Sequence, residues 1–167
     1  MDPSSVDPEG SVSSLGEFGL IDGIVSRLGQ RHARTLVGAG EDDAAVLEVG
    51  GLLQLATLDA LVDGTHFERA RIAPRVLGRR LAAVNLSDVA AMGGRPTHAL
   101  AGLVAPPDLP ARYALDVVEG LVEQLARFGA DLVGGNVSRG DRLVLDLALL
   151  GEVDPDRLLL RSGARPG

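Results

Sequence analysis

The sequence predicts an α+β fold in which one mixed or antiparallel sheet is layered with helices. Two observations predict it. Apolar, strand-like runs alternate with stretches of helical periodicity, in the order helix, β-hairpin, helix, strand, helix and strand pair. The strands are also apolar on both sides, since Asp146 is the one polar interruption in residues 143–150. The sheet face away from the helices must therefore be covered, and the sheet of a partner subunit would cover it.

Composition limits the classes of function. The 167 residues suit one domain, and a hydrophobic content of 46% excludes a disordered chain. A net charge of −7 argues against nucleic acid as the main partner. All 16 basic residues are Arg, which excludes a P-loop or Schiff-base lysine. The absence of Cys excludes thiol catalysis, Cys-ligated zinc and disulfides.

The sequence predicts neither a signal peptide nor a membrane-spanning helix. Residues 1–14 are polar and contain proline, which predicts a disordered tail. They lack the basic and apolar regions of a signal peptide. No apolar run reaches the length of about 18 residues that predicts a membrane-spanning helix. The expected location is therefore the cytoplasm, with no membrane partner.

A helix is predicted to begin at Leu15 and to end before Gly29. Its apolar residues fall at helical spacing: Phe18, Ile21, Ile24, Val25 and Leu28. Glu17 is either a first-turn acid that the helix dipole favours or a functional residue. Residues 30–41 are expected to form a loop.

A β-hairpin follows, and it carries the first acidic residues of interest. Residues 44–49 and 52–58 predict two strands, because each is an apolar run, and two glycines between them predict a tight turn. The strands have similar lengths, so antiparallel pairing should bring Asp42 and Asp43 near Asp59. Acidic residues where a strand enters a loop are well placed to hold a cation.

The stretch from Asp59 to Phe67 is expected to be a loop that leaves the second strand of the hairpin. The helix after it is predicted over residues 74–92, with Pro74 in its first turn. Asn85 and Asp88 share one face of this largely apolar helix. A carboxylate there is costly unless it is paired or binds metal. The alternative is an Asp88 satisfied by a backbone amide or an Arg. We predict that the fold brings the acidic groups of the three segments together.

The remaining chain predicts two more strands and a helix before a final strand. Residues 97–105 form a strand that the proline-rich residues 106–110 stop. Residues 111–128 predict an amphipathic helix with an inward face: Leu115, Val118, Leu121, Val122, Leu125 and Phe128. A short strand, 131–133, should end in a turn at 134–139 that either presents backbone amides to phosphate or is an ordinary glycine hairpin. The last strand covers 143–153.

These motifs resemble, in order, those of the N-terminal domain of thiamine-monophosphate kinases, in the aminoimidazole ribonucleotide synthetase superfamily. The resemblance covers about residues 15–167. The matching segments are residues 16–18 with 20–21, 42–46, 57–67, 85–93 and 134–136. The second and third acidic segments, 57–67 and 85–93, are specific, whereas the glycine turns are not. The resemblance implies a domain over 15–153, a linker over 154–167 to a further domain, and a homodimer whose sheets combine into a barrel.

The implied activity is phosphorylation of thiamine monophosphate to thiamine diphosphate by ATP with magnesium. The resemblance implies catalytic roles for Asp42, Asp59 and Asp88. It gives magnesium ligation to Asp42, Asp43, Asp59 and Asp88. Binding of ATP falls to Asp43, Asn85, Ser87, Gly135 and Asn136. Binding of the thiamine phosphate falls to Asp63, Gly64, His66 and Phe67, although His66 could instead be an ordinary surface histidine.

Two residues depart from the family pattern. Glu41 stands where the family has glycine, or is an insertion, and Asn136 replaces an aspartate that would bind metal. The isolated chain, as half of such an enzyme, is expected to be inactive. Two alternatives stay open: a non-catalytic module that dimerises and binds nucleotide, and a superfamily member that acts on another substrate with ATP.

Overall fold

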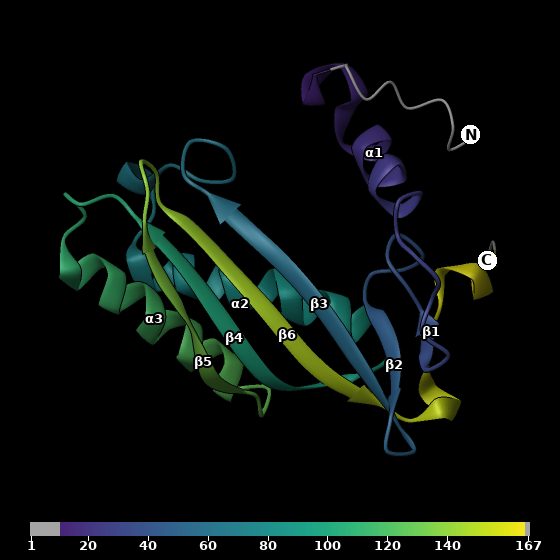
Figure 1. Ribbon diagram of the computed structural model, residues 1–167. Coiled ribbons are helices and arrows are strands. Elements are labelled where there is room, and N and C mark those ends of the chain that lie inside the picture. Colours follow the sequence, from purple (N-terminus) through teal and green to yellow (C-terminus); the bar gives the residue numbers. More distant parts are fainter. Residues whose placement is uncertain (1–10, 166–167) are drawn as a thin grey trace.

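The computed structural model describes residues 11–165 (Figure 1). Most of the predicted disordered tail lies outside the described residues, but its last part is helical. Helix α1 (Val12–Val25) begins three residues before the predicted start, because the Ser11 side chain accepts a hydrogen bond from the Ser14 amide at its N-terminus. The helix is kinked at Gly16, whose φ is +68°. It extends away from the sheet in Figure 1, and Phe18 is 81% exposed.

A six-stranded mixed sheet confirms the predicted fold class. The strand order is β1-β2-β3-β6-β4-β5, and β4–β5 is the one parallel pair. The strands are β1 (Thr35–Val37), β2 (Ala45–Val49), β3 (Leu52–Val62), β4 (Arg95–Ala105), β5 (Asp131–Arg139) and β6 (Val144–Val153). The predicted hairpin is confirmed, because Val49 pairs with Leu52 across the glycine turn.

The largest differences from the prediction concern strands β1, β3 and β5. Strand β1 lies within the predicted loop 30–41, because Thr35–Val37 finds partners along β2. Strand β3 continues four residues past Leu58, because β6 pairs with it as far as Val62. Strand β5 continues through the predicted turn at 134–139, because it pairs in parallel with β4. A Cβ at Gly135 would lie 1.9 Å from the Ala101 carbonyl oxygen, so the glycine there permits close strand approach.

Helices α2 (Pro74–Ala91) and α3 (Ala111–Ala126) cover one face of the sheet (Figure 1). They pack closely on each other at two glycines. A Cβ on Gly78 would lie 1.9 Å from the Val117 carbonyl oxygen, and one on Gly120 would lie 2.1 Å from the Arg75 carbonyl oxygen. The core forms between these helices and the sheet, with Leu55, Leu81 and Leu147 among its fully buried side chains.

The predicted inward face of α3 is wrong for four of its six residues. Leu121 and Leu125 are buried, but the exposed ones are Leu115, Val118, Val122 and Phe128. The reason is the close contact with α2, which turns Val117 and Gly120 inward. Helix α3 therefore has a narrower buried stripe than its periodicity suggests.

The second face of the sheet is not covered by any element within residues 11–165. Leu58, Leu100 and Leu150 are exposed there, whereas Ala99 and Leu149, strand neighbours of Leu100 and Leu150 on the helix side, are buried. Asp146 lies on the same open face, in a shallow hollow with Asn136. No helix in the described part of the chain is long and apolar enough to cross a membrane.

Candidate cation and phosphate site

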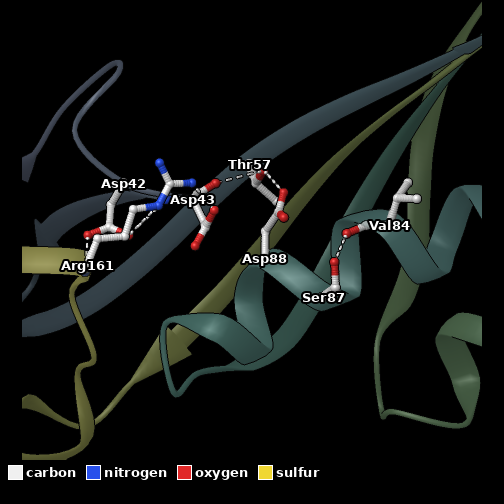
Figure 2. Close-up of polar contacts among 7 residues, drawn as sticks. All are labelled: Asp42, Asp43, Thr57, Val84, Ser87, Asp88 and Arg161. Atoms are coloured by element: carbon white, nitrogen blue, oxygen red, sulfur yellow. Dashed lines mark hydrogen bonds and ion pairs between the residues drawn. The ribbon is translucent and has the colours of Figure 1, made fainter. Parts of the chain in front are cut away.

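Thr57 joins the first acidic segment to the third. It lies on the helix-facing side of β3, and its hydroxyl donates a hydrogen bond of 2.7 Å to Asp88 Oδ2 on α2. The same hydroxyl oxygen lies 3.5 Å from the carbonyl oxygen of Asp43 (Figure 2). The predicted convergence of Asp43 and Asp88 is thus present. The sequence offered a backbone amide or an Arg as the partner that could satisfy Asp88. The hydrogen-bond partner is instead the Thr57 hydroxyl.

Asn85 connects Asp59 to the same helix. Its side-chain oxygen accepts a hydrogen bond from the Asp59 amide at 3.0 Å, and its side-chain nitrogen donates to the Leu81 carbonyl at 3.0 Å. Asn85 is fully buried. Because both halves of the amide are paired, its burial costs little. Asn85 therefore fixes Asp59 on β3 against α2.

The Asn85 bridge gives a stability prediction. Replacing Asn85 with Leu keeps the volume but leaves the Asp59 amide without its partner. We expect the free energy of unfolding to fall by about 1–3 kcal/mol, the cost of an unsatisfied buried donor. Urea denaturation measures it. Asn136→Leu is the matched control, because Asn136 is exposed, and its effect should stay within about 0.5 kcal/mol. Equal effects of the two changes would contradict the bridging role.

The surroundings of Asp88 disfavour the charged form of its carboxyl group. Burial raises its pKa above the ordinary value, and the negative charges of Asp59 and Asp43 raise it further. The Thr57 hydrogen bond and the Arg161 charge oppose this effect without reversing it. Half-buried acids held close to each other favour a cation, because a cation relieves both the burial and the repulsion.

The raised pKa of Asp88 sets the sign of a pH dependence. A folded-state pKa above the unfolded value means that the folded protein binds the proton more tightly. The Asp88 contribution to stability is therefore present below the unfolded pKa, and it falls as the pH rises through the folded pKa. Asp88→Asn should be more stable than the native protein at neutral pH, and this advantage should vanish below about pH 4. Urea denaturation of the two proteins across this pH range measures the difference in stability. A native protein more stable than Asp88→Asn at neutral pH would contradict the prediction.

Arg161 binds both carboxylates of the first acidic pair, Asp42 and Asp43. Its backbone amide donates to Asp42 Oδ2 at 2.9 Å, and its guanidinium forms an ion pair with Asp43 (Figure 2). Arg161 belongs to the short 3-10 helix η4 (Arg161–Gly163) of the predicted linker. Sequence reasoning missed both Arg161 and Thr57. The two-residue period that places Thr57 and Asp59 on one face of a strand could have found Thr57, but no local signal marks Arg161.

Glu41 takes no part in this cluster. Its carboxylate accepts hydrogen bonds from the Gly38 amide and from the Arg31 guanidinium, each at 2.8 Å. The Gly38 amide in particular lowers the pKa of Glu41. The additional acid therefore closes the 38–41 turn and pairs with Arg31.

The substrate residues predicted in the second acidic loop lie apart from the cluster. Asp63 comes four residues after Asp59 along an extended chain, about 13 Å away. Its Oδ1 accepts a hydrogen bond from the Arg69 amide at 2.9 Å, and His66 Nδ1 accepts one from the Val62 amide at 3.0 Å. Phe67 is buried beneath the loop. The loop lines a hollow whose residues are Gly64, Thr65, His66, Phe67, Glu68, Arg71, Ile72 and Arg80.

Three predicted nucleotide residues lie away from the acidic side chains. The Ser87 hydroxyl donates to the Val84 carbonyl at 2.6 Å and points away from Asp88 in Figure 2. Gly135 and Asn136 lie in β5, and Asn136 donates to the Ser138 hydroxyl at 2.9 Å. Both β5 residues border the hollow on the open sheet face. Their roles in nucleotide binding stay predictions.

The donor set suits magnesium when other ligands complete its shell. Within the described chain, no three His, Cys, Asp or Glu side chains converge closely enough to hold a metal ion alone. Magnesium usually keeps several waters and binds one or two carboxylates together with substrate phosphates. The oxygens of Asp42, Asp43 and Asp88 fit that mode, and those of Asp59 are close enough to raise the pKa of Asp88.

Comparison with known proteins shows the family to which this fold belongs. The family model of the AIR synthase related protein, N-terminal domain, matches residues 41–153, and the chain belongs to this family. It is 35% identical over 157 residues to the thiamine-monophosphate kinase of Mycobacterium tuberculosis strain H37Rv, covering 94% of this chain and 46% of that protein. It is 36% identical over 171 residues to the selenide, water dikinase of Geobacter metallireducens, covering 98% and 47%.

Solved structures share the fold. The structure of AaThiL complexed with AMPPCP and TMP aligns with a TM-score of 0.83 and 34% identity, over 96% of this chain and 49% of that one. The structure of thiamine monophosphate kinase from Aquifex aeolicus aligns with a TM-score of 0.75 and 32% identity, over 95% and 48%. The chain spans about half the length of the curated relatives it matches.

Proposed function

We propose that this chain is the cation- and nucleotide-binding half of a kinase that transfers a phosphate group from ATP to thiamine monophosphate. The observation that carries the proposal is the Thr57–Asp88 hydrogen bond beside Asp43, which gathers acids from separate segments. The likeness to AaThiL, which was solved with AMPPCP and TMP, supports both substrates. Thiamine-monophosphate kinase relatives at about one-third identity support the same acceptor.

We assign the following roles to the residues of the site. Asp42, Asp43, Asp59 and Asp88 would hold magnesium, which supplies charge neutralisation for the phosphates of ATP. Asn85 keeps the Asp59 backbone in place through its hydrogen bond. The hollow at Gly64, His66 and Phe67 is the proposed site of the thiamine phosphate. Its Arg71 and Arg80 side chains add positive charge that suits an anionic acceptor.

The open face of the sheet supports a homodimer. It exposes Leu58, Leu100 and Leu150, and an apolar sheet face of this kind favours a second sheet over water. A second copy of the chain would supply that sheet and form the barrel that the resemblance implies. An enzyme that consumes ATP also fits the cytoplasm, where we place it.

The assay that tests the function needs a chain that extends past Gly167 to the length of the relatives. With ATP and magnesium, this protein should convert thiamine monophosphate to thiamine diphosphate and ADP, which chromatography separates. Selenide is the comparison acceptor, because one relative is a selenide, water dikinase. Turnover of selenide without turnover of thiamine monophosphate would overturn the substrate and favour the second candidate. Nucleotide binding without turnover of either would favour a non-catalytic module.

A further inference from the structure

Arg161 is joined to an acidic pair more than a hundred residues earlier in the chain. Its backbone amide donates to Asp42 Oδ2 at 2.9 Å, Nε lies 3.7 Å from Asp42 Oδ1, and the guanidinium forms a hydrogen-bonded ion pair with Asp43. No other basic side chain of residues 11–165 forms an ion pair with either carboxylate. The guanidinium therefore stands where the proposed function places a cation.

The two sides of this contact differ in their exposure to water. The Arg161 side chain is 61% exposed, whereas the Asp42 side chain is 5% exposed. Water can solvate the guanidinium if it leaves, whereas with Arg161 in place the Asp42 carboxylate is almost fully covered. Departure of Arg161 alone would leave Asp42 and Asp43 without their shared positive charge, and only the Asp43 amide would still donate to Asp42 Oδ1, at 3.0 Å, so departure is unfavourable. Departure becomes favourable when another cation takes its place.

The segment around Arg161 is attached to the domain in a way that permits this exchange. Leu158 packs against the core, and the Leu159 amide donates to the Met92 carbonyl at 3.2 Å. After Leu159, the other backbone hydrogen bonds of the segment are local, from Gly163 to Leu160 and from Ala164 to Arg161. Arg161 could therefore move without disturbing the core.

We infer that Arg161 is a displaceable counter-ion that blocks the Asp42–Asp43 pair until a divalent cation replaces it. The inference rests on the proposed function for the identity of the cation as magnesium. It goes beyond that function, because it makes the segment after β6 a gate on the site. Binding of the cation would free Arg161 and loosen η4 at the same time.

Calorimetry of the 167-residue chain with Mg²⁺ alone tests the gate. Arg161→Gln should bind Mg²⁺ about fivefold more tightly than the native chain, because no guanidinium competes. Arg157→Gln removes the same charge from a neighbouring exposed position and is the control, with little change expected. Arg161→Lys should restore weaker binding. Equal or weaker Mg²⁺ binding by Arg161→Gln would overturn the inference, as would the absence of Mg²⁺ binding by both chains.

Hydrogen exchange supplies a second readout on the native chain. The Arg161 backbone amide, which donates to Asp42, should exchange faster with solvent when Mg²⁺ is added. Slower exchange would show that Arg161 closes over the cation and would overturn the gate. Neither measurement uses thiamine monophosphate or ATP. A failed kinase assay would therefore leave these outcomes unaffected, and the two failures can be told apart.

Discussion

Asp88→Asn is expected to lower phosphate transfer to thiamine monophosphate by at least about 100-fold in a chain extended to the length of its relatives. The change removes one negative charge from the proposed cation site but keeps an oxygen that can accept the Thr57 hydrogen bond. The same change should stabilise the fold at neutral pH, because burial and two neighbouring acids raise the pKa of the native Asp88. Initial rates at saturating ATP measure the loss.

The opposite directions of these two effects separate function from folding. A merely structural Asp88 would lose activity and stability together, or neither. Asp156→Asn is the matched control, because Asp156 is exposed in η3 (Pro155–Arg157) and has the same charge. Full activity in Asp88→Asn would exclude Asp88 from the site, whereas an equal loss in Asp156→Asn would point to a general charge effect.

Gly78→Ala should cause a large loss of stability in the domain. The new Cβ would lie 1.9 Å from the Val117 carbonyl oxygen and 2.7 Å from the Leu121 nitrogen, so α2 and α3 must separate. Backbone atoms cannot move aside as a flexible side chain can. We expect a cost of about 3 kcal/mol, which lowers the melting temperature by roughly 6–12 °C. Thermal unfolding followed by circular dichroism measures it.

Gly19→Ala is the control for this prediction. Gly19 lies in α1, and a Cβ there would meet the Leu15 Cβ at an ordinary distance of 3.6 Å. Alanine favours helix, so this change should stabilise the domain by about 0.5 kcal/mol or leave it unchanged. If Gly78→Ala had as little effect as Gly19→Ala, the close contact between α2 and α3 would not be the one described.

The parts of the site that depend on local order were predictable from sequence. Two apolar runs of similar length around two glycines place Asp43 beside β3, and Pro74 marks the start of α2. Asn85 and Asp88 share a helix face because they are three residues apart. The hydrogen bond from Thr57 to Asp88 forms where these locally predictable elements, β3 and α2, pack together.

The remaining parts depend on pairing that no local pattern encodes. Strand β5 passes through Gly134 and Gly135 because β4 offers it a parallel partner, and glycines that predict a turn here permit close strand approach. The exposed side of α3 follows from the contact at Gly120, which periodicity does not register. Arg161 reaches Asp42 across most of the chain, and only the folded arrangement reveals that contact.

The most direct test of the acidic site is paramagnetic broadening by Mn²⁺ in the 167-residue chain with a non-hydrolysable ATP analogue. The amide signals of Asp43, Thr57 and Asp88 should broaden first, because the proposed cation lies among their side chains. Equal amounts of diamagnetic Mg²⁺ should shift these signals without broadening them. Sharp signals at all three residues, with broadening centred instead on Asp146 of the open sheet face, would contradict the proposed site.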